Sequence, residues 1–208
     1  MAFMLTLDPE IRGMVPMSID LRPLPKMTDE EFFLFCQANR ELRIERTAEG
    51  EIIMMAPAGG ETGGRNANLV TDLNIWARIN KQGIVFDSST GFDLPDGATR
   101  SPDAAWVRRE RLTQLTTDQK RRFLPICPDF IIELRSATDS LHAAQDKMAE
   151  WIANGVQLGW LLDPTERSVH VYRPGHPPEK LQNSATIFAE PVLPGFVLDL
   201  AAIWTPGF

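Results

Sequence analysis

The chain has 208 residues, of which 43% are hydrophobic and 24% are charged, a balance ordinary for a globular protein that buries a full core. The length indicates one domain, which we place at residues 28–208, behind an N-terminal arm at residues 1–27 that is rich in proline and methionine and lacks periodicity. The net charge of −7 argues against a passive coat protein for nucleic acid. It leaves open an enzyme whose metal ions neutralise an acidic site.

Neither a basic leader followed by an apolar run nor a long uncharged apolar stretch occurs in the sequence. Secretion signals and membrane-spanning helices are therefore not expected. The two cysteines, Cys36 and Cys127, both have apolar neighbours, which favours buried thiols in a reducing compartment. We therefore predict a cytoplasmic protein.

In chain order, the first predicted element is a helix that follows Thr28. Thr28 and Glu31 form a capping-box pattern, and phenylalanines in the next turn give the helix an apolar face. Two strand-like runs, LRIER and EIIMMA, then flank a glycine-containing turn and predict a β-hairpin. The stretch PAGGETGG is interpreted as a flexible connection to a helix that begins near Arg65 and stops at Gly83. It lacks the Gly-Lys-Ser/Thr ending of a nucleotide-binding loop.

The second half of the chain alternates between strands and helices. Short strands are predicted at IVFDS and GFDL, followed by a strand in SPDAAWVRR and a helix in RRERLTQL. PDFIIELRS is the most strand-like segment, TDSLHAAQDKMAEWIANG is the clearest helix, and VQLGWLLD and SVHVYRP predict two more strands. Basic runs at 40–46, 108–111 and 120–122 are interpreted as solvated helix faces. This order predicts an α/β fold with a mixed sheet.

Two segments carry carboxylates in the arrangement that a hard divalent cation requires. Asp103 stands at the entry of the strand in SPDAAWVRR, and Glu133 lies inside the apolar strand PDFIIELRS. Because side chains alternate along a strand, Glu133 shares one face with Asp129 and Arg135. Mg²⁺ prefers one or two carboxylates completed by water and substrate phosphate, and a nearby cation stabilises a phosphate under attack. The alternative is a structural ion pair between Glu133 and Arg135.

These motifs resemble the Pro-Asp…(Asp/Glu)-x-Lys pattern of the restriction-endonuclease superfamily. More closely, residues 28–172 resemble the Uma-type family of restriction endonucleases. The resemblance rests on the order and spacing of LRIERTAEGEIIMMAP, GGETGGRNANL, SPDAAWV, PDFIIELRSATDS, and DKMAEWIANGVQLGWLLDP with VHVYRP. It implies a restriction-endonuclease-like core with flanking helices and an N-terminal β-hairpin.

The same resemblance implies roles for individual residues. Asp103 and Glu133 would hold Mg²⁺ or Mn²⁺, and Glu45, on the first strand of the hairpin, would complete the metal site. Arg135 fills the superfamily's usual lysine position, whereas the family's lysine in the following helix corresponds to Lys147. Arginine stabilises phosphate charge but is a poor proton shuttle. Lys147 is therefore the favoured catalytic cation, with Arg135 as the alternative.

By this resemblance the protein is a divalent-metal-dependent endonuclease that hydrolyses phosphodiester bonds. DNA is favoured over RNA as its partner, and a homodimer is expected because two cuts in a duplex need two sites. A second hypothesis, motivated by arginine at position 135, is a catalytically decayed nuclease fold that acts as a nucleic-acid-binding or interaction module. An unrelated α/β-hydrolase-like enzyme is poorly supported, since the sequence has no Gly-x-Ser-x-Gly elbow and its histidines lack zinc spacing.

Overall fold

The computed structural model describes residues 17–19 and 25–207, so most of the predicted arm lies outside the described residues. The chain forms two compact units, which we call unit 1 and unit 2 and describe separately. Unit 1 consists of the residues up to Pro57, Ser89–Ser101 and Thr116–Ile126. Unit 2 consists of Ala58–Ser88, Pro102–Leu115 and Cys127–Phe208. Compact units need not fold independently, so the single domain at residues 28–208 stays a prediction.

The helix α1 (Asp29–Ala38) belongs to unit 1. Its predicted capping box is present: the Glu31 amide donates to the Thr28 hydroxyl, and the Thr28 amide donates to the Glu31 carboxylate. Phe32 and Phe35 are the buried residues of this helix, and they share a small core with apolar residues of the neighbouring hairpin. The predicted cap and apolar face are therefore both confirmed.

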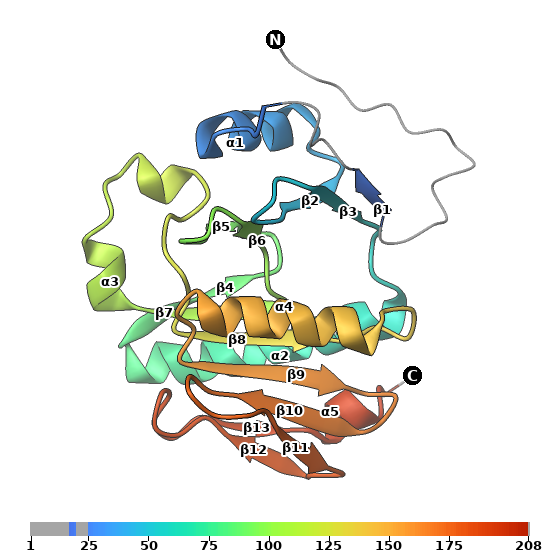
Figure 1. Cartoon of the computed structure of the whole chain (residues 1–208). Coiled ribbons are helices and arrows are strands. Elements are labelled where there is room, and N and C mark those ends of the chain that lie inside the picture. Colours follow the sequence, from blue (N-terminus) through green and yellow to red (C-terminus); the bar gives the residue numbers. More distant parts are fainter. Residues whose placement is uncertain (1–16, 20–24, 208) are drawn as a thin grey trace. The chain divides into compact units, whose positions relative to one another are not determined.

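An antiparallel sheet in the order β1-β3-β2-β6-β5 forms the rest of unit 1, together with one 3-10 turn (Figure 1). These elements are β1 (Met17–Ile19), β2 (Arg43–Arg46), β3 (Ile52–Met55), β5 (Phe92–Asp93), β6 (Thr99–Arg100) and η1 (Gln119–Arg121). β2 and β3 are the predicted hairpin. Gly50 in its turn has a φ of 93°, a conformation that favours glycine.

Unit 2 is organised around a six-stranded mixed sheet in the order β11-β10-β9-β8-β7-β4 (Figure 1). Its strands are β4 (Gly83–Asp87), β7 (Ala104–Arg108), β8 (Phe130–Leu134), β9 (Leu158–Asp163), β10 (Ser168–Tyr172) and β11 (Glu179–Gln182). β8 and β9 are parallel, and the other neighbours are antiparallel. Parallel neighbours need a crossover connection, which α4 (Leu141–Ala153) supplies. The predicted α/β fold with a mixed sheet is confirmed.

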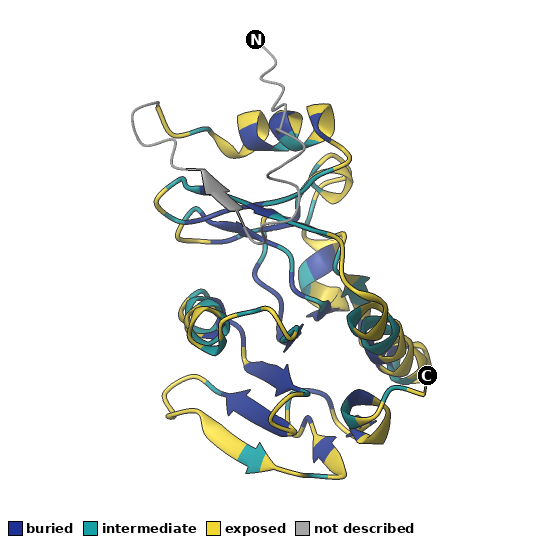
Figure 2. Ribbon diagram, turned by 90° about the vertical axis from the view of Figure 1, so that its right-hand side faces the viewer, coloured by how far each residue is buried: buried dark blue, intermediate teal, exposed yellow. Residues whose placement is uncertain are grey.

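The helices α2 (Gly60–Asn80) and α4 cover opposite faces of this sheet. Leu69 and Leu73 of α2 share the main core with Phe130 and Ile132 of β8. The side chains of α4 instead reach Glu133, which points to the other face because successive residues of a strand alternate. β8, β9 and β10 are buried along their whole length (Figure 2).

The start of α2 corrects the sequence-based interpretation. The helix begins at Gly60 and Gly59 is its N-cap, so three of the four glycines that were expected to form a flexible connection are helical. Glycine disfavours a helix by about 1 kcal/mol per residue relative to alanine. The helix forms nevertheless because Leu69, Leu73 and Ala77 are buried in the core, and packing supplies most of the stability of helices in proteins.

The remaining elements of unit 2 are α3 (Arg109–Thr113), β12 (Thr186–Phe188), β13 (Val197–Asp199) and α5 (Ala201–Trp204). Neither cysteine forms a disulfide: Cys127 is buried, and Cys36 is half-buried. Burial raises the pKa of the Cys36 thiol to about 12. None of the described helices combines the length and the hydrophobicity that crossing a bilayer requires.

Candidate functional site

Asp103 lies directly before β7 and is held by two elements of unit 2. Its Oδ2 accepts a hydrogen bond from the backbone amide of Leu134 at 2.8 Å. Its Oδ1 accepts a hydrogen bond from Nδ2 of Asn66 on α2 at 2.9 Å. The antiparallel register of β7 and β8, continued by one residue, puts Asp103 opposite Glu133. Unit 2 therefore brings the two predicted catalytic carboxylates together at one end of the β7–β8 pair.

Glu133 is the fourth residue of β8 and is only 9% exposed. Its Oε1 accepts a hydrogen bond from Nε1 of Trp151 at 2.8 Å, and Nζ of Lys147 lies 3.0 Å from the same oxygen. Lys147 and Trp151 are four residues apart on α4, so their side chains lie on one face of that helix. A buried carboxylate is costly unless it is paired. α4 therefore provides the charge and the hydrogen bond that Glu133 needs.

Arg135 has different partners from those considered in the sequence. Its Nη1 lies 2.8 Å from Oδ2 of Asp163, and its Nε donates to the carbonyl of Asp139. Asp163 is fully buried at the end of β9, and its Oδ1 accepts hydrogen bonds from two backbone amides of the turn that follows. Arg135 thus joins the end of β8 to the turn after β9. The structural alternative of a Glu133–Arg135 ion pair is wrong, because Arg135 pairs with Asp163.

Glu45 lies on β2 in unit 1 and is almost completely buried. Its Oε2 is 3.1 Å from Nη1 of Arg100, and its Oε1 accepts a hydrogen bond from the amide of Ser101 at 3.0 Å. These contacts fix the backbone two residues before Asp103 in the sequence. They give Glu45 a structural function within unit 1, and its role as a third metal ligand stays a prediction.

The donor chemistry of Asp103 and Glu133 fits a hard cation. Both supply carboxylate oxygens, and Mg²⁺ is commonly held by one or two carboxylates with water and substrate phosphate as the other ligands. No three His, Cys, Asp or Glu side chains in the described part of the chain gather in a group able to hold a metal ion. A site built on these two residues therefore depends on water and on a phosphate group for its remaining ligands.

Two residues that contact the carboxylates were missed at the level of sequence. Asn66 follows the glycine-rich stretch that was interpreted as a connection, and Trp151, on the apolar side of its predicted helix, was given no role in the site. Trp151 is indeed fully buried, but its indole nitrogen also donates to Glu133. The spacing of Lys147 and Trp151, one helical turn apart, is the signal that could have identified Trp151. No comparable local signal marks Asn66.

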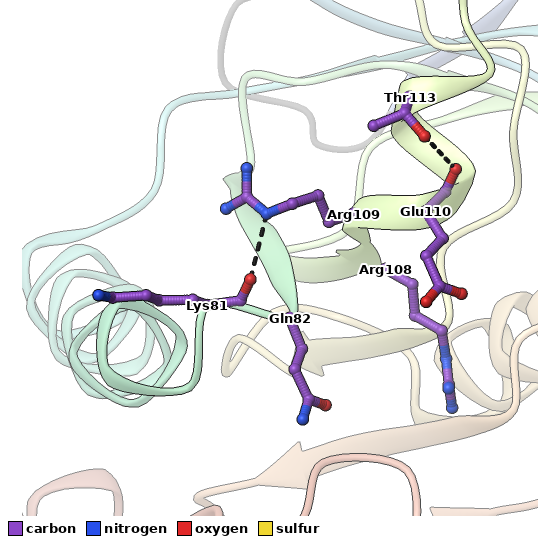
Figure 3. A pocket seen from close by; sticks show the side chains of 6 residues that line it. All are labelled: Lys81, Gln82, Arg108, Arg109, Glu110 and Thr113. Atoms are coloured by element: carbon purple, nitrogen blue, oxygen red, sulfur yellow. Dashed lines mark hydrogen bonds between the residues drawn. The ribbon is translucent and has the colours of Figure 1, made fainter.

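A hollow of about 530 Å³ lies in unit 2 at the far end of β7 from Asp103. It is lined by Lys81, Gln82, Arg108, Arg109, Glu110 and Thr113 (Figure 3). Two of its cations have structural partners: Nε of Arg109 donates to the carbonyl of Lys81, and Nε of Arg108 lies 3.5 Å from Asp129. The hollow contains neither predicted catalytic carboxylate, so we assign it no part in the chemistry.

Comparison with known proteins supports the fold and the family. Residues 29–201 match a family, Uma2, that is described as "Putative restriction endonuclease". A search of curated proteins gives no significant match. Among solved structures, the chain is similar to "a putative nuclease belonging to DUF820" from Anabaena variabilis, with a TM-score of 0.69 and 21% identity over 86% of this chain and 97% of that chain. This likeness shows a shared fold. Because the family match covers most of the chain, the protein belongs to the Uma2 family.

Proposed function

We propose that the protein is a divalent-metal-dependent endonuclease that hydrolyses phosphodiester bonds in DNA. The observation that carries the proposal is the meeting of Asp103 and Glu133 at one end of the β7–β8 pair, with Lys147 at 3.0 Å from Glu133. Carboxylates on neighbouring strands with an adjacent cation are what phosphodiester hydrolysis by a metal site requires. Membership of a restriction endonuclease family supports the same reaction.

In this proposal, Asp103 and Glu133 hold one or two Mg²⁺ or Mn²⁺ ions. When bound, such an ion supplies Lewis-acid stabilisation and lowers the pKa of its water. Lys147 would offset the negative charge that grows on the phosphate while the water oxygen bonds to phosphorus and the bond to the leaving oxygen breaks. The attacking water loses a proton to solvent, and the leaving oxygen takes up one from solvent. Trp151 orients Glu133 through its hydrogen bond to Oε1. Arg135 has a structural role and not a catalytic one, because its guanidinium is already paired with Asp163.

The experiment is a cleavage assay with isosteric variants. Wild type, Asp103→Asn and Glu133→Gln are incubated with plasmid DNA and with labelled single- and double-stranded DNA and RNA, in Mg²⁺, Mn²⁺ or chelator. Asp146→Asn and Glu166→Gln serve as controls, because these two acids of unit 2 are exposed. We expect metal-dependent cleavage of DNA that falls by at least about 100-fold in the two site variants and is unchanged in the controls.

Two outcomes would contradict the proposal. Cleavage that persists in folded Asp103→Asn and Glu133→Gln would show that the site is elsewhere. Nucleic-acid binding without cleavage in any metal would favour the catalytically decayed module instead.

A second set of variants tests Lys147 as the catalytic cation. Lys147→Met should lower the cleavage rate by about 100-fold while Mn²⁺ binding is retained, and Lys147→Arg should restore part of the rate because it restores the positive charge. Equal loss in Lys147→Met and Lys147→Arg would mean that a proton carried by lysine, and not its charge alone, is needed.

A homodimer is proposed for the active form, because cutting both strands of a duplex requires two active centres. Light scattering of the protein with and without duplex DNA measures the assembly. Double-strand breaks made by a protein that stays monomeric throughout would contradict it.

A further inference from the structure

Asn66 is the residue of α2 that contacts a predicted catalytic carboxylate. Its Nδ2 donates to Oδ1 of Asp103 at 2.9 Å. Its own Oδ1 is buried and has no hydrogen-bond partner among the residues that the structure describes. The side chain thus uses its donor on the carboxylate and presents an unsatisfied acceptor on the same amide group.

The orientation of this amide follows from the chemistry of its partner. A carboxylate accepts hydrogen bonds and does not donate them, so the nitrogen of Asn66 must face Asp103 and the oxygen must face away. Buried polar atoms in native proteins are nearly always satisfied, often by an ordered water molecule. The unsatisfied oxygen of Asn66 therefore indicates a bound donor beside the Asn66 amide. Asparagine is suited to this position because one planar group carries both a donor and an acceptor.

We infer that Asn66 is a positioning residue for the metal centre. Its Nδ2 fixes the carboxylate of Asp103, and its Oδ1 accepts a hydrogen bond from a water molecule of the metal's hydration shell. This inference rests on the proposed function, since it assumes that Asp103 is a metal ligand. Partners of this kind orient metal ligands, and their removal typically weakens metal affinity 10–100-fold.

The competing explanation is that Asn66 only ties α2 to the start of β7. Such a tie would contribute to folding stability without changing the affinity of the folded protein for a metal ion. The two explanations therefore differ in metal binding and not in thermal stability.

The first test measures Mn²⁺ binding by calorimetry in wild type, Asn66→Ala and Asn66→Leu. Leucine keeps the volume of the side chain but neither hydrogen bond, so it remains informative if the alanine variant folds poorly. Asn68→Ala is the matched control, because Asn68 is an exposed asparagine of the same helix. We expect the Kd for Mn²⁺ to rise by about 10-fold or more in both Asn66 variants and to stay within about twofold in the control.

The second test observes the Asn66 amide itself. The side-chain ¹⁵N–¹H₂ signals of Asn66 are assigned by their loss in Asn66→Ala, and those of Asn68 by their loss in Asn68→Ala. Saturating Mg²⁺ should shift the Asn66 signals and leave the Asn68 signals in place, because only the first amide lies beside the metal. Asn66 signals that stay in place at saturating Mg²⁺ would contradict the inference.

The outcomes separate this inference from the proposed function. If wild type binds Mn²⁺, Asp103→Asn abolishes binding and the Asn66 variants bind like wild type, the inference about Asn66 is wrong and the metal site stands. If wild type itself binds no Mn²⁺, both are overturned.

Discussion

Two cations near the end of β8 neutralise different carboxylates. Lys147 lies against Glu133, whereas Arg135 lies against Asp163. Their residue types agree with these roles: the planar guanidinium suits a buried pair that also binds a backbone carbonyl, and the lysine ammonium is the cation whose proton is more easily exchanged. Strand parity puts Arg135 on the same face as Glu133. Arg135 nevertheless pairs with Asp163 because of the parallel register of β8 and β9. Leu134 lies opposite Leu162, so the next residue of each strand, Arg135 or Asp163, lies beside the other.

Removal of the cation from the Arg135–Asp163 pair should destabilise the fold. Arg135→Met leaves a fully buried carboxylate without its cation, and we expect the free energy of unfolding to fall by about 3 kcal/mol. Urea denaturation measures the change. Arg173→Met is the matched control, because the Arg173–Glu179 pair is exposed and its Nη1 and Oε2 atoms are 3.7 Å apart. Its loss should lower the free energy of unfolding by less than about 1 kcal/mol. Equal effects of the two substitutions would show that Arg135 is not a structural residue.

The second residue-scale prediction concerns the pH dependence of stability. Burial, and then the charge of Lys180, lower the pKa of His170 on β10, while Asp163 opposes them. In the unfolded chain, His170 has the ordinary histidine pKa of about 6.5. As the pH falls, His170 is therefore protonated in the unfolded chain at a higher pH than in the folded protein. The stability that neutral His170 contributes is present above that pH and is lost as the pH falls through the lower pKa of the folded state.

Unfolding by urea at several pH values between about 7 and 5 measures this loss. His170→Leu should flatten the dependence, whereas His142→Gln should not, because His142 is exposed on α4. An unchanged slope in His170→Leu would contradict the prediction.

At the scale of elements, two glycines let secondary structures approach closely in unit 2. A Cβ on Gly159 of β9 would lie 2.6 Å from Cε of Met148 on α4. A Cβ on Gly83 of β4 would lie 2.4 Å from the carbonyl oxygen of Val107 and 2.3 Å from Cε2 of Trp106. The first contact involves the end of a flexible side chain, and the second involves backbone and a buried ring. α4 depends on this packing to carry Lys147 and Trp151 to Glu133.

The element-scale prediction follows from that difference. Gly83→Ala should destabilise the protein by about 3 kcal/mol, because backbone and a buried indole cannot move aside, whereas Gly159→Ala should cost about 1 kcal/mol, since Met148 can adjust. Thermal unfolding of the two variants measures which substitution destabilises the protein more. A smaller cost for Gly83→Ala than for Gly159→Ala would contradict it. Mn²⁺ binding by Gly159→Ala then reports whether α4 keeps its position over Glu133.

At the scale of the whole molecule, three segments of unit 1 alternate with three segments of unit 2, so the chain passes from one unit to the other five times. Neither unit can be formed from one continuous piece of chain. In unit 1, Phe123 of the third segment packs against the core that α1 and β3 form in the first segment. The main core of unit 2 joins residues as distant in sequence as Leu69 and Ile203. Both cores are therefore complete only when distant parts of the chain have come together.

The whole-molecule prediction is that the chain unfolds in one cooperative transition, as a single domain over residues 28–208 would. Differential scanning calorimetry measures it: the calorimetric and van't Hoff enthalpies should agree. Two resolved transitions, with Thr28→Ala shifting only one of them through loss of the cap on α1, would show instead that the two units are separate domains.

Most of the elements, and the family, could be predicted from the amino-acid sequence alone. The capping box at Thr28, the hairpin and the alternation around Glu133 are local patterns, and each is recorded in residues that lie within a few positions of one another. The order of the motifs was sufficient to predict the mixed sheet and to select Asp103 and Glu133 as the candidate metal ligands. The prediction failed locally at Gly60, where packing of the later turns of α2 outweighed the low helix propensity of glycine.

The contacts between distant side chains could not be predicted from the sequence. Asn66 and Asp103 are 37 positions apart and Arg135 and Asp163 are 28 positions apart, and their contacts depend on strand order and register. Those are set by the burial of the whole core and not by neighbouring residues, because many strand orders satisfy the same local alternation. The sequence therefore identified the two carboxylates as candidates. The packing of α2 and α4 against the sheet brought Asn66, Lys147 and Trp151 to them.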